Sequence, residues 1–223
     1  MLFDFPYGVL INQLKPRSST GLIVDAEEII QQLQIPFGVF YPDWGSVTLA
    51  KIASKYNGNF LDMGTGSGFI AIYLAKLGKE VEASDISSKA LAAANKNFAH
   101  FGLSSRLLYS SLYSNIPSKY DVVCYNPPKV SRESEFKQFL KSALSRSLPS
   151  SALNLLIQTF IEIDTKSRRA ELIYLIEQSK SHLVERGVLL LNLISEDSTW
   201  LASYYPVSEK ASNGKRTVVE ISL

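Results

Sequence analysis

Cysteine is scarce in this chain of 223 residues, and the scarcity excludes two ways of stabilising a fold. With Cys124 alone, the chain has no internal disulfide framework and no metal cage built only from cysteines. We interpret Cys124 as a small buried strand residue and expect a reducing compartment. His100 and His182 have no partner at ligand spacing, so the sequence predicts no metal site.

Long apolar runs and a strong charge excess are also missing. No apolar run approaches the roughly 20 residues of a membrane-spanning helix. The first residues lack the basic start, apolar stretch and cleavage site of a secretory signal, so we expect a cytoplasmic protein with no membrane partner. The 23 Lys and Arg against 21 Asp and Glu leave a formal charge of +2, without the basic excess of a strong nucleic-acid binder.

The chain does contain enough apolar sequence for a large core. Its residues are 46% hydrophobic, which fits one globular domain with at most a small appendage. Short β-rich runs alternate with helical patterns of about ten to fifteen residues. This alternation predicts an α/β fold: a Rossmann-like, open, mostly parallel sheet of seven strands with helices on both faces. We expect residues 1–56 to form a small N-terminal extension or entrance segment, and 57–223 the main domain.

The stretch from Asn59 to Ile70 has the pattern of a nucleotide-type site. An apolar strand runs into Asp62, glycines follow at positions 64, 66 and 68, and a helix starts at Phe69. Glycine permits positive φ and has no Cβ, so a ligand can lie against the backbone near the free N–H groups of the helix start. The spacing G-x-G-x-G differs from the G-x-G-x-x-G of dinucleotide sites. We therefore predict adenosyl-sulfonium binding and not pyrophosphate binding.

Two further polar positions end predicted strands. Asp85 follows Gly64 by 21 residues (85 − 64), near the separation that brings a carboxylate to the ribose of a bound nucleoside. Its alternative role is a helix cap, which Ser87 also offers. The β-rich run 120–125 stops at Asn126, because the prolines at 127 and 128 cannot donate to a sheet ladder. In a parallel sheet these residues meet at one crevice, beyond the carboxyl ends of the strands.

Three other segments leave alternatives open. Residues 35–46, rich in aromatics, prolines and glycines, form either an ordered loop against the ligand or an ordinary surface turn. Residues 130–165 form either a lid or substrate wall, as an insertion in the main domain, or a plain pair of helices. Their basic side chains are more typical of a solvated face than of a nucleic-acid contact. Residues 208–216, around Asn213 and Gly214, are expected to be a hairpin turn into the last strand.

The glycine loop with Asp62, Asp85 and the Asn-Pro-Pro turn at 126–128 resembles the class I S-adenosylmethionine-dependent methyltransferases. The most similar pattern is the amino-methylating branch, which includes the release-factor glutamine methyltransferases and the RNA and DNA base N-methyltransferases. The resemblance covers about residues 37 to 128 by motif, and the rest by strand order. It implies S-adenosyl-L-methionine as the cofactor and a transferase as the activity.

The resemblance also implies roles for individual residues. The implied cofactor-binding residues are Asp62, Gly64, Thr65, Gly66, Gly68, Asp85, Ile86, Ser111 and Asn126. The implied catalytic residues are Asn126, Pro127 and Pro128, and the implied substrate-binding residues are Tyr41, Trp44, Tyr125 and Lys129. Lys129 stands where relatives usually carry an aromatic residue, and the serines at 110 and 111 stand where they often carry an acid.

The turn at Asn126 suits an acceptor nitrogen whose lone pair is delocalised. The carbonyl oxygens of the Asn126 side chain and the Pro127 backbone are two acceptors that can grip two N–H bonds and turn the lone pair toward the methyl group. Catalysis is then positioning and electrostatics, without a strong base. The alternative for this turn is a mere end to a strand.

We therefore expect an N-methyltransferase that acts on a small molecule or a protein side chain. The first alternative is an RNA or DNA base N-methyltransferase, which the modest net charge does not favour. The second alternative is a cofactor-binding interaction module without catalysis. We expect a monomer or a homodimer.

Overall fold

A computed structural model describes residues 24–127 and 150–223 of the chain. The chain divides into two compact units, the first made of Met1–Pro127 with Ser179–Leu223 and the second of Pro128–Gln178. The first unit holds the whole described sheet. Of the second unit, the structure describes residues 150–178, which belong to one long helix.

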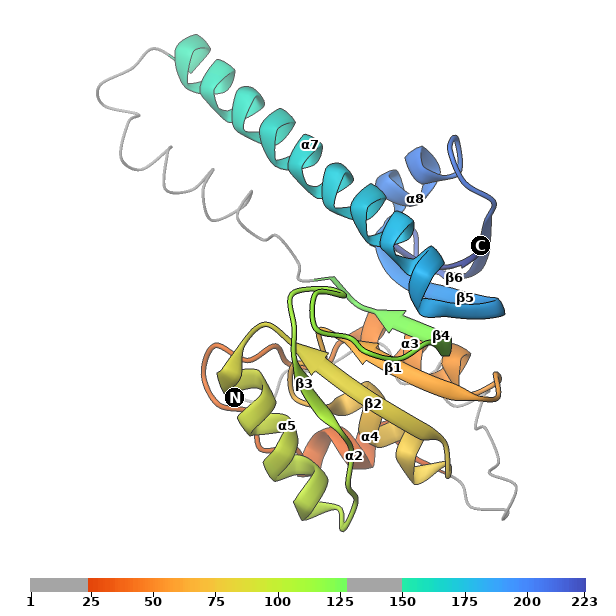
Figure 1. Cartoon of the computed structure of the whole chain (residues 1–223). Helices are drawn as coiled ribbons and strands as arrows, with labels where there is room; N and C mark the ends of the chain where they lie inside the picture. The colour runs from red at the N-terminus through yellow and green to blue at the C-terminus, as the bar shows by residue number, and fades with distance from the viewer. Residues whose placement is uncertain (1–23, 128–149) are drawn as a thin grey trace. The chain divides into compact units, whose positions relative to one another are not determined.

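Seven strands form one sheet in the order β3-β2-β1-β4-β5-β7-β6 (Figure 1). Their bounds are β1 Asn59–Met63, β2 Glu80–Asp85, β3 Leu107–Tyr109, β4 Tyr120–Tyr125, β5 Leu183–Ile194, β6 Val207–Ser212 and β7 Arg216–Ser222. The strands from β3 to β5 pair in parallel, and β7 is antiparallel to both β5 and β6. The predicted α/β fold with a seven-stranded, mostly parallel sheet is therefore confirmed.

The helices of the first unit cover this sheet. Their bounds are α2 Ala26–Gln32, α3 Trp44–Ala53, α4 Phe69–Lys76, α5 Ser88–His100 and α8 Ser195–Leu201. Helix α4 contacts α2, α3 and α5, so these four form one helical layer, whereas α8 packs on β5, β6 and β7. Helix α7, Ser150–His182, has 33 residues and enters the first unit only with its last turn.

Strands β1 and β4, in the middle of the sheet, are buried on both faces, as is usual for parallel sheets. Phe60 and Leu61 of β1 and Val122 and Val123 of β4 point to opposite faces, and each is at most 1% exposed. The core on one face also takes in side chains of α2 and α3, such as Leu49. The described part of the predicted 1–56 extension thus packs in the same compact unit as the sheet.

Two boundaries differ from the sequence-based expectation. Residues 207–212 form strand β6 and not part of a turn, because they pair along β7; only Asn213, Gly214 and Lys215 make the connection, with Gly214 at φ 81°. Helix α3 begins at Trp44, inside the aromatic segment. It starts there because Asp43 and Ser46 form a capping box, in which each side chain accepts from the backbone N–H of the other residue.

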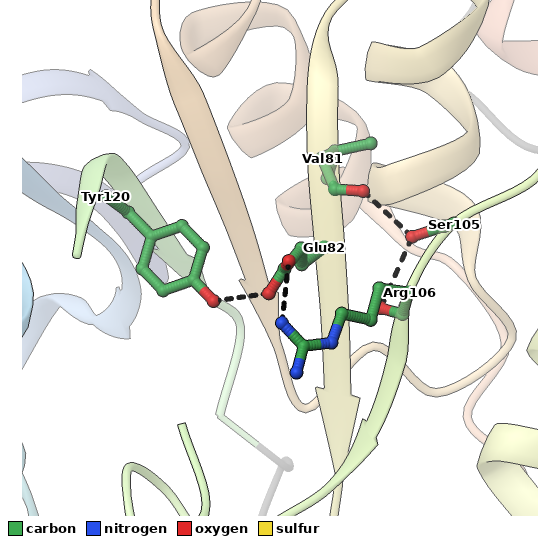
Figure 2. A network of polar contacts seen from close by, with 5 residues as sticks. All are labelled: Val81, Glu82, Ser105, Arg106 and Tyr120. Carbon is green, nitrogen blue, oxygen red and sulfur yellow. Dashed lines mark hydrogen bonds and ion pairs between the residues drawn. The ribbon is translucent and has the colours of Figure 1, made fainter. Parts of the chain in front are cut away.

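A polar network closes the edge where β1, β2 and β4 begin (Figure 2). The Tyr120 hydroxyl donates to Glu82 Oε2 at 2.6 Å, and Arg106 Nη1 donates to Glu82 Oε1 at 3.4 Å. Ser105 Oγ donates to the Val81 carbonyl at 2.8 Å, and these residues line a cavity of about 640 Å³. The network ties β4 to β2 at the edge opposite the carboxyl ends of the strands.

Replacing Tyr120 with phenylalanine tests the contribution of this network to stability. The substitution removes the donor to Glu82 while keeping the buried ring, so we expect the free energy of unfolding to fall by about 1 kcal/mol. Urea denaturation measures the change. The matched control is Tyr109→Phe on β3, whose side chain is 59% exposed and whose loss of a hydroxyl should change little. Equal unfolding midpoints for the two variants would contradict the prediction.

Candidate cofactor and acceptor site

The glycine loop leaves the carboxyl end of β1 and leads directly into α4. Gly64, Gly66 and Gly68 have φ values of 66°, 57° and 87°, a region that side chains with a Cβ rarely adopt. The Thr65 N–H donates to the Ser84 carbonyl at 2.9 Å and thereby joins the loop to β2. The predicted backbone conformation is therefore present in all three glycines.

Asp62 anchors the loop from beneath. Its side chain is 1% exposed, and Oδ2 accepts from Thr65 Oγ1 at 2.6 Å and from the Ala71 N–H of α4 at 3.2 Å. Burial raises the pKa of the Asp62 carboxyl from 3.8 to about 7, although both hydrogen bonds favour the charged form. In this arrangement Asp62 and Thr65 fix the shape of the loop, and the exposed surface belongs to Gly64.

Asp85 reaches the same loop from the end of β2. Its Oδ2 accepts from the Gly66 N–H at 2.9 Å, and Oδ1 accepts from the Ser87 N–H at 2.8 Å. The helix cap is Ser87, whose Oγ accepts from the Ala90 N–H of α5 at 3.2 Å. Because a carboxylate oxygen can accept more than one hydrogen bond, Asp85 retains acceptor capacity beside the loop. Ile86, the next residue, is 61% exposed.

Asn97 braces the loop, and the sequence analysis missed it. This α5 residue is fully buried; its Nδ2 donates to the Ser67 carbonyl at 2.8 Å, and its Oδ1 accepts from the Gln34 N–H at 2.8 Å. The available signal was a polar residue three positions after Ala94 on the buried stripe of a helix. A single amide thus links the loop to the segment that follows α2.

The aromatic segment lies next to the loop, with some rings exposed and others covered. Phe37, Phe40 and Tyr41 are 96%, 42% and 55% exposed, respectively. The Cβ of Phe40 is 3.9 Å from the point where a Cβ on Gly66 would lie. Trp44, at the start of α3, is partly buried against the core. Of the predicted substrate residues in this segment, Tyr41 is therefore accessible to a ligand.

Tyr125 lies under the loop and is 5% exposed. A Cβ on Gly64 would be 3.3 Å from its Cε2, which is a tight contact. The ring therefore supports the glycine loop from the end of β4.

Asn126 begins the turn after β4 and is held on both sides of its amide. Its Nδ2 donates to Ser46 Oγ of α3 at 2.9 Å, and its Oδ1 accepts from Asn192 Nδ2 of β5 at 2.8 Å. Asn192 in turn accepts from Arg216 of β7, with Nε to Oδ1 at 3.2 Å and Nη2 to the backbone carbonyl at 2.7 Å. No pattern in the sequence pointed to Asn192 as part of the site.

The other predicted site residues divide into described and undescribed ones. Pro127 follows Asn126 and is partly buried, whereas Pro128 and Lys129 lie outside the described residues. Ser111 is exposed beyond the end of β3, and its N–H donates to Ser114 Oγ at 3.2 Å. Within residues 24–127 and 150–223 there is no group of three or more metal-binding side chains. The same residues include no helix long and apolar enough to cross a membrane.

The sheet order and the elements at its carboxyl edge define the class of protein. A sheet of order 3-2-1-4-5-7-6 with an antiparallel β7, a loop of three glycines after β1, a carboxylate after β2 and an Asn-Pro turn after β4 form the predicted class I S-adenosylmethionine-dependent methyltransferase fold. The family model described as methyltransferase small domain matches residues 30–170, more than half of the chain. The chain therefore belongs to the methyltransferase small domain family, which confirms the predicted class.

Similar proteins come from two branches of methyltransferases. The chain is 36% identical over 90 residues to ribosomal RNA small subunit methyltransferase C of Alcanivorax borkumensis, covering 39% of this chain and 28% of that protein. It is 34% identical over 146 residues to the release factor glutamine methyltransferase of Flavobacterium psychrophilum, covering 64% of this chain and 45% of that protein. The chain thus spans less than half of the length of either relative.

A solved structure supports the fold. The ribosomal protein L11 methylase of Lactobacillus delbrueckii subsp. bulgaricus superposes with a TM-score of 0.58 at 21% identity. The superposition covers 85% of this chain and 84% of that chain.

The buried Asp62 carboxyl predicts how stability depends on pH. Because the pKa is 3.8 before folding and about 7 in the folded protein, the folded state binds the extra proton between these values. Its contribution to the free energy of unfolding therefore decreases as pH rises from about 4 to about 7. Asp62→Asn removes this titration, so wild type should lose stability relative to the variant between pH 5 and pH 8. Urea denaturation of both proteins at these pH values measures the difference, and parallel pH curves would contradict it.

Proposed function

We propose that this chain is an S-adenosylmethionine-dependent N-methyltransferase whose acceptor nitrogen belongs to an amide or an exocyclic ring amine. The observation that carries the proposal is the fixed amide of Asn126 at the carboxyl end of β4, across β1 from Asp85. A turn that merely ended a strand would not need both hydrogen-bonding groups of its side chain held by α3 and β5.

The proposed chemistry starts from an acceptor nitrogen whose lone pair is shared with a π system. Asn126 Oδ1 accepts one hydrogen bond from Asn192 and keeps a second lone pair for an acceptor N–H. The Pro127 carbonyl, next along the chain, is proposed to accept the other N–H. Gripping both bonds turns the nitrogen lone pair toward the methyl group, so the protein contributes positioning and electrostatics.

A bound S-adenosylmethionine would supply an electrophilic methyl group and leave as the thioether, and the acceptor nitrogen would give up one proton to water. The described residues fit an adenosyl ligand. Asp85 presents a carboxylate with acceptor capacity for ribose hydroxyls, and the exposed Ile86 offers an apolar surface for a base. Gly64 presents bare backbone on the exposed side of the loop. We also include Gly66, Gly68 and Ser111 among the proposed cofactor-binding residues.

Replacing Asn126 with alanine tests the proposal directly. The substitution removes the acceptor oxygen, so we expect methyl transfer to be abolished while the dissociation constant of the cofactor stays within a few-fold. Transfer is measured with S-adenosylmethionine labelled on its methyl group, and cofactor binding by calorimetry.

The matched control is Asn95→Ala on the exposed face of α5, which should leave both quantities unchanged. Full methyl transfer by the Asn126 variant would remove the proposed catalytic role of the turn.

For the acceptor we propose an amide of a protein side chain. The match to a release factor glutamine methyltransferase covers 64% of this chain, against 39% for the ribosomal RNA methyltransferase named above, and the net charge is only +2. An RNA base is the second candidate, because two of the relatives are ribosomal RNA methyltransferases, 36% and 34% identical over 90 and 102 residues. A cytoplasmic location and a monomeric or homodimeric state stay predictions.

Labelling in a cell extract separates these candidates. After incubation with methyl-labelled cofactor, we expect label in material that protease digests and ribonuclease does not. Label that ribonuclease removes would support the RNA base. So would binding to ribosomal RNA whose logarithmic binding constant falls linearly with the logarithm of the salt concentration. The absence of any labelled acceptor would instead favour a cofactor-binding module without catalysis.

A further inference from the structure

We propose that Asn192 of β5 is a positioning residue that sets the orientation of the Asn126 amide for methyl transfer. The inference rests on the proposed function of Asn126. Asn192 has no exposed surface, so it acts through Asn126 and not by touching the acceptor.

The hydrogen bonds around Asn126 form a row in which every group donates in the same direction. Arg216 Nε donates to Asn192 Oδ1 at 3.2 Å, and Asn192 Nδ2 donates to Asn126 Oδ1 at 2.8 Å. Asn126 Nδ2 donates to Ser46 Oγ at 2.9 Å, and Ser46 Oγ donates to Asp43 Oδ1 at 3.2 Å. We call these five residues the amide row.

The ends of the amide row determine which way each amide faces. Arg216 has only donors, so it requires the oxygen of Asn192 on its side, and the Asn192 NH₂ group must then face Asn126. The Asp43 carboxylate only accepts, so it requires the Ser46 hydroxyl proton, and the Ser46 oxygen is then left to accept from the Asn126 NH₂ group. Both ends therefore demand the same orientation of Asn126.

Because Gly45 has no Cβ, it leaves the space that the Asn192 amide occupies. A Cβ at Gly45, in the first turn of α3, would lie 1.7 Å from Asn192 Nδ2 and 2.6 Å from its Cγ. Any larger residue at this position would displace the amide. The helix that carries Ser46 therefore approaches β5 closely only because residue 45 is glycine.

The amide row fixes the direction in which Asn126 can accept a hydrogen bond from the acceptor nitrogen. With Asn192 and Ser46 occupying fixed sides of the amide, the remaining lone pair of Asn126 Oδ1 has one direction, and the donation from Asn192, itself bonded to Arg216, polarises the Asn126 carbonyl. Without Asn192, the amide could rotate and present its NH₂ group to an acceptor nitrogen. A donor there would repel the N–H bonds that the reaction must grip.

Replacing Asn192 with aspartate isolates this role. The aspartate has the same shape and still accepts from Arg216, but it cannot donate to Asn126, so the Asn126 amide should turn over. We expect kcat to fall about 10-fold or more, as for other residues that orient a functional group. The cofactor dissociation constant and the urea midpoint should stay near wild-type values. A role in stability alone would instead lower the midpoint and the cofactor-binding fraction together with kcat.

Two further variants accompany Asn192→Asp. Asn95→Asp adds the same charge on exposed α5 and should leave kcat unchanged. Gly45→Ala displaces Asn192 without changing its chemistry and should also lower kcat, measured at saturating cofactor. The kinetic assays use the labelled material identified in the extract experiment as acceptor.

A measurement without any acceptor tests the same contact. In a ¹H–¹⁵N NMR spectrum of the wild-type protein, the side-chain NH₂ signals of Asn126 are assigned as the pair that is absent from the spectrum of Asn126→Ala. The Asn126 NH₂ group donates to Ser46 Oγ, and loss of the Asn192 contact in Asn192→Leu should let the amide rotate away from Ser46, so its protons should exchange with solvent about 10-fold faster or more. Unchanged exchange, or wild-type kcat in Asn192→Asp, would overturn the positioning role. Failure of the proposed function is separate: it would appear as full activity of Asn126→Ala, or as no transfer by wild type with the exchange result intact.

Discussion

The parallel register of β1 with its two neighbours is the constraint on which the site depends. Met63 at the end of β1 pairs with Ser84 of β2 on one side and with Tyr125 of β4 on the other. The residues that follow these three positions are Gly64, Asp85 and Asn126, so they lie side by side at the carboxyl edge of the sheet. Since neighbouring side chains in a strand point to opposite faces, a slip of one residue would exchange the two buried faces of β1 and separate these groups. The hydrophobic core that fixes the register therefore also aligns the site.

Two polar side chains buried at this edge, Asp62 and Asn97, are each held by specific hydrogen-bond partners. Burying an amide or a carboxyl is costly unless it is hydrogen-bonded. Asn97 meets this requirement with the Ser67 carbonyl and the Gln34 N–H, and Asp62 meets it with Thr65 and Ala71. The same bonds hold the glycine loop against α4, α5 and the segment after α2. These bonds fix the shape of the loop, which reduces the cost of ordering it on binding.

The fold, the glycine loop and the strand-end carboxylate were predictable because their signals are local. The glycines after an apolar strand and the acid at the end of the next one are read within a few residues, and the strand–helix alternation gives the sheet. Asn192 gave no such signal: within a continuous apolar strand, periodicity does not show that one buried position has an amide and a glycine of another helix opposite it. Strand β6 was missed for a related reason, because Val207–Ser212 is mostly exposed and owes its conformation to pairing with β7. In both cases the information lies in a tertiary contact.

The start of α3 connects the segment before the core to the chemistry proposed at β4. Ser46 closes the capping box with Asp43 and also accepts from Asn126, so one hydroxyl group serves both a helix terminus and the Asn126 amide. Loss of the cap would release the Ser46 side chain, and Asn126 would lose the partner of its NH₂ group. Helix α3 also affects Asn192, because the Asn192 amide occupies the space left by Gly45. The first turn of α3, at the end of the aromatic segment, therefore forms one wall of the setting in which Asn126 is held.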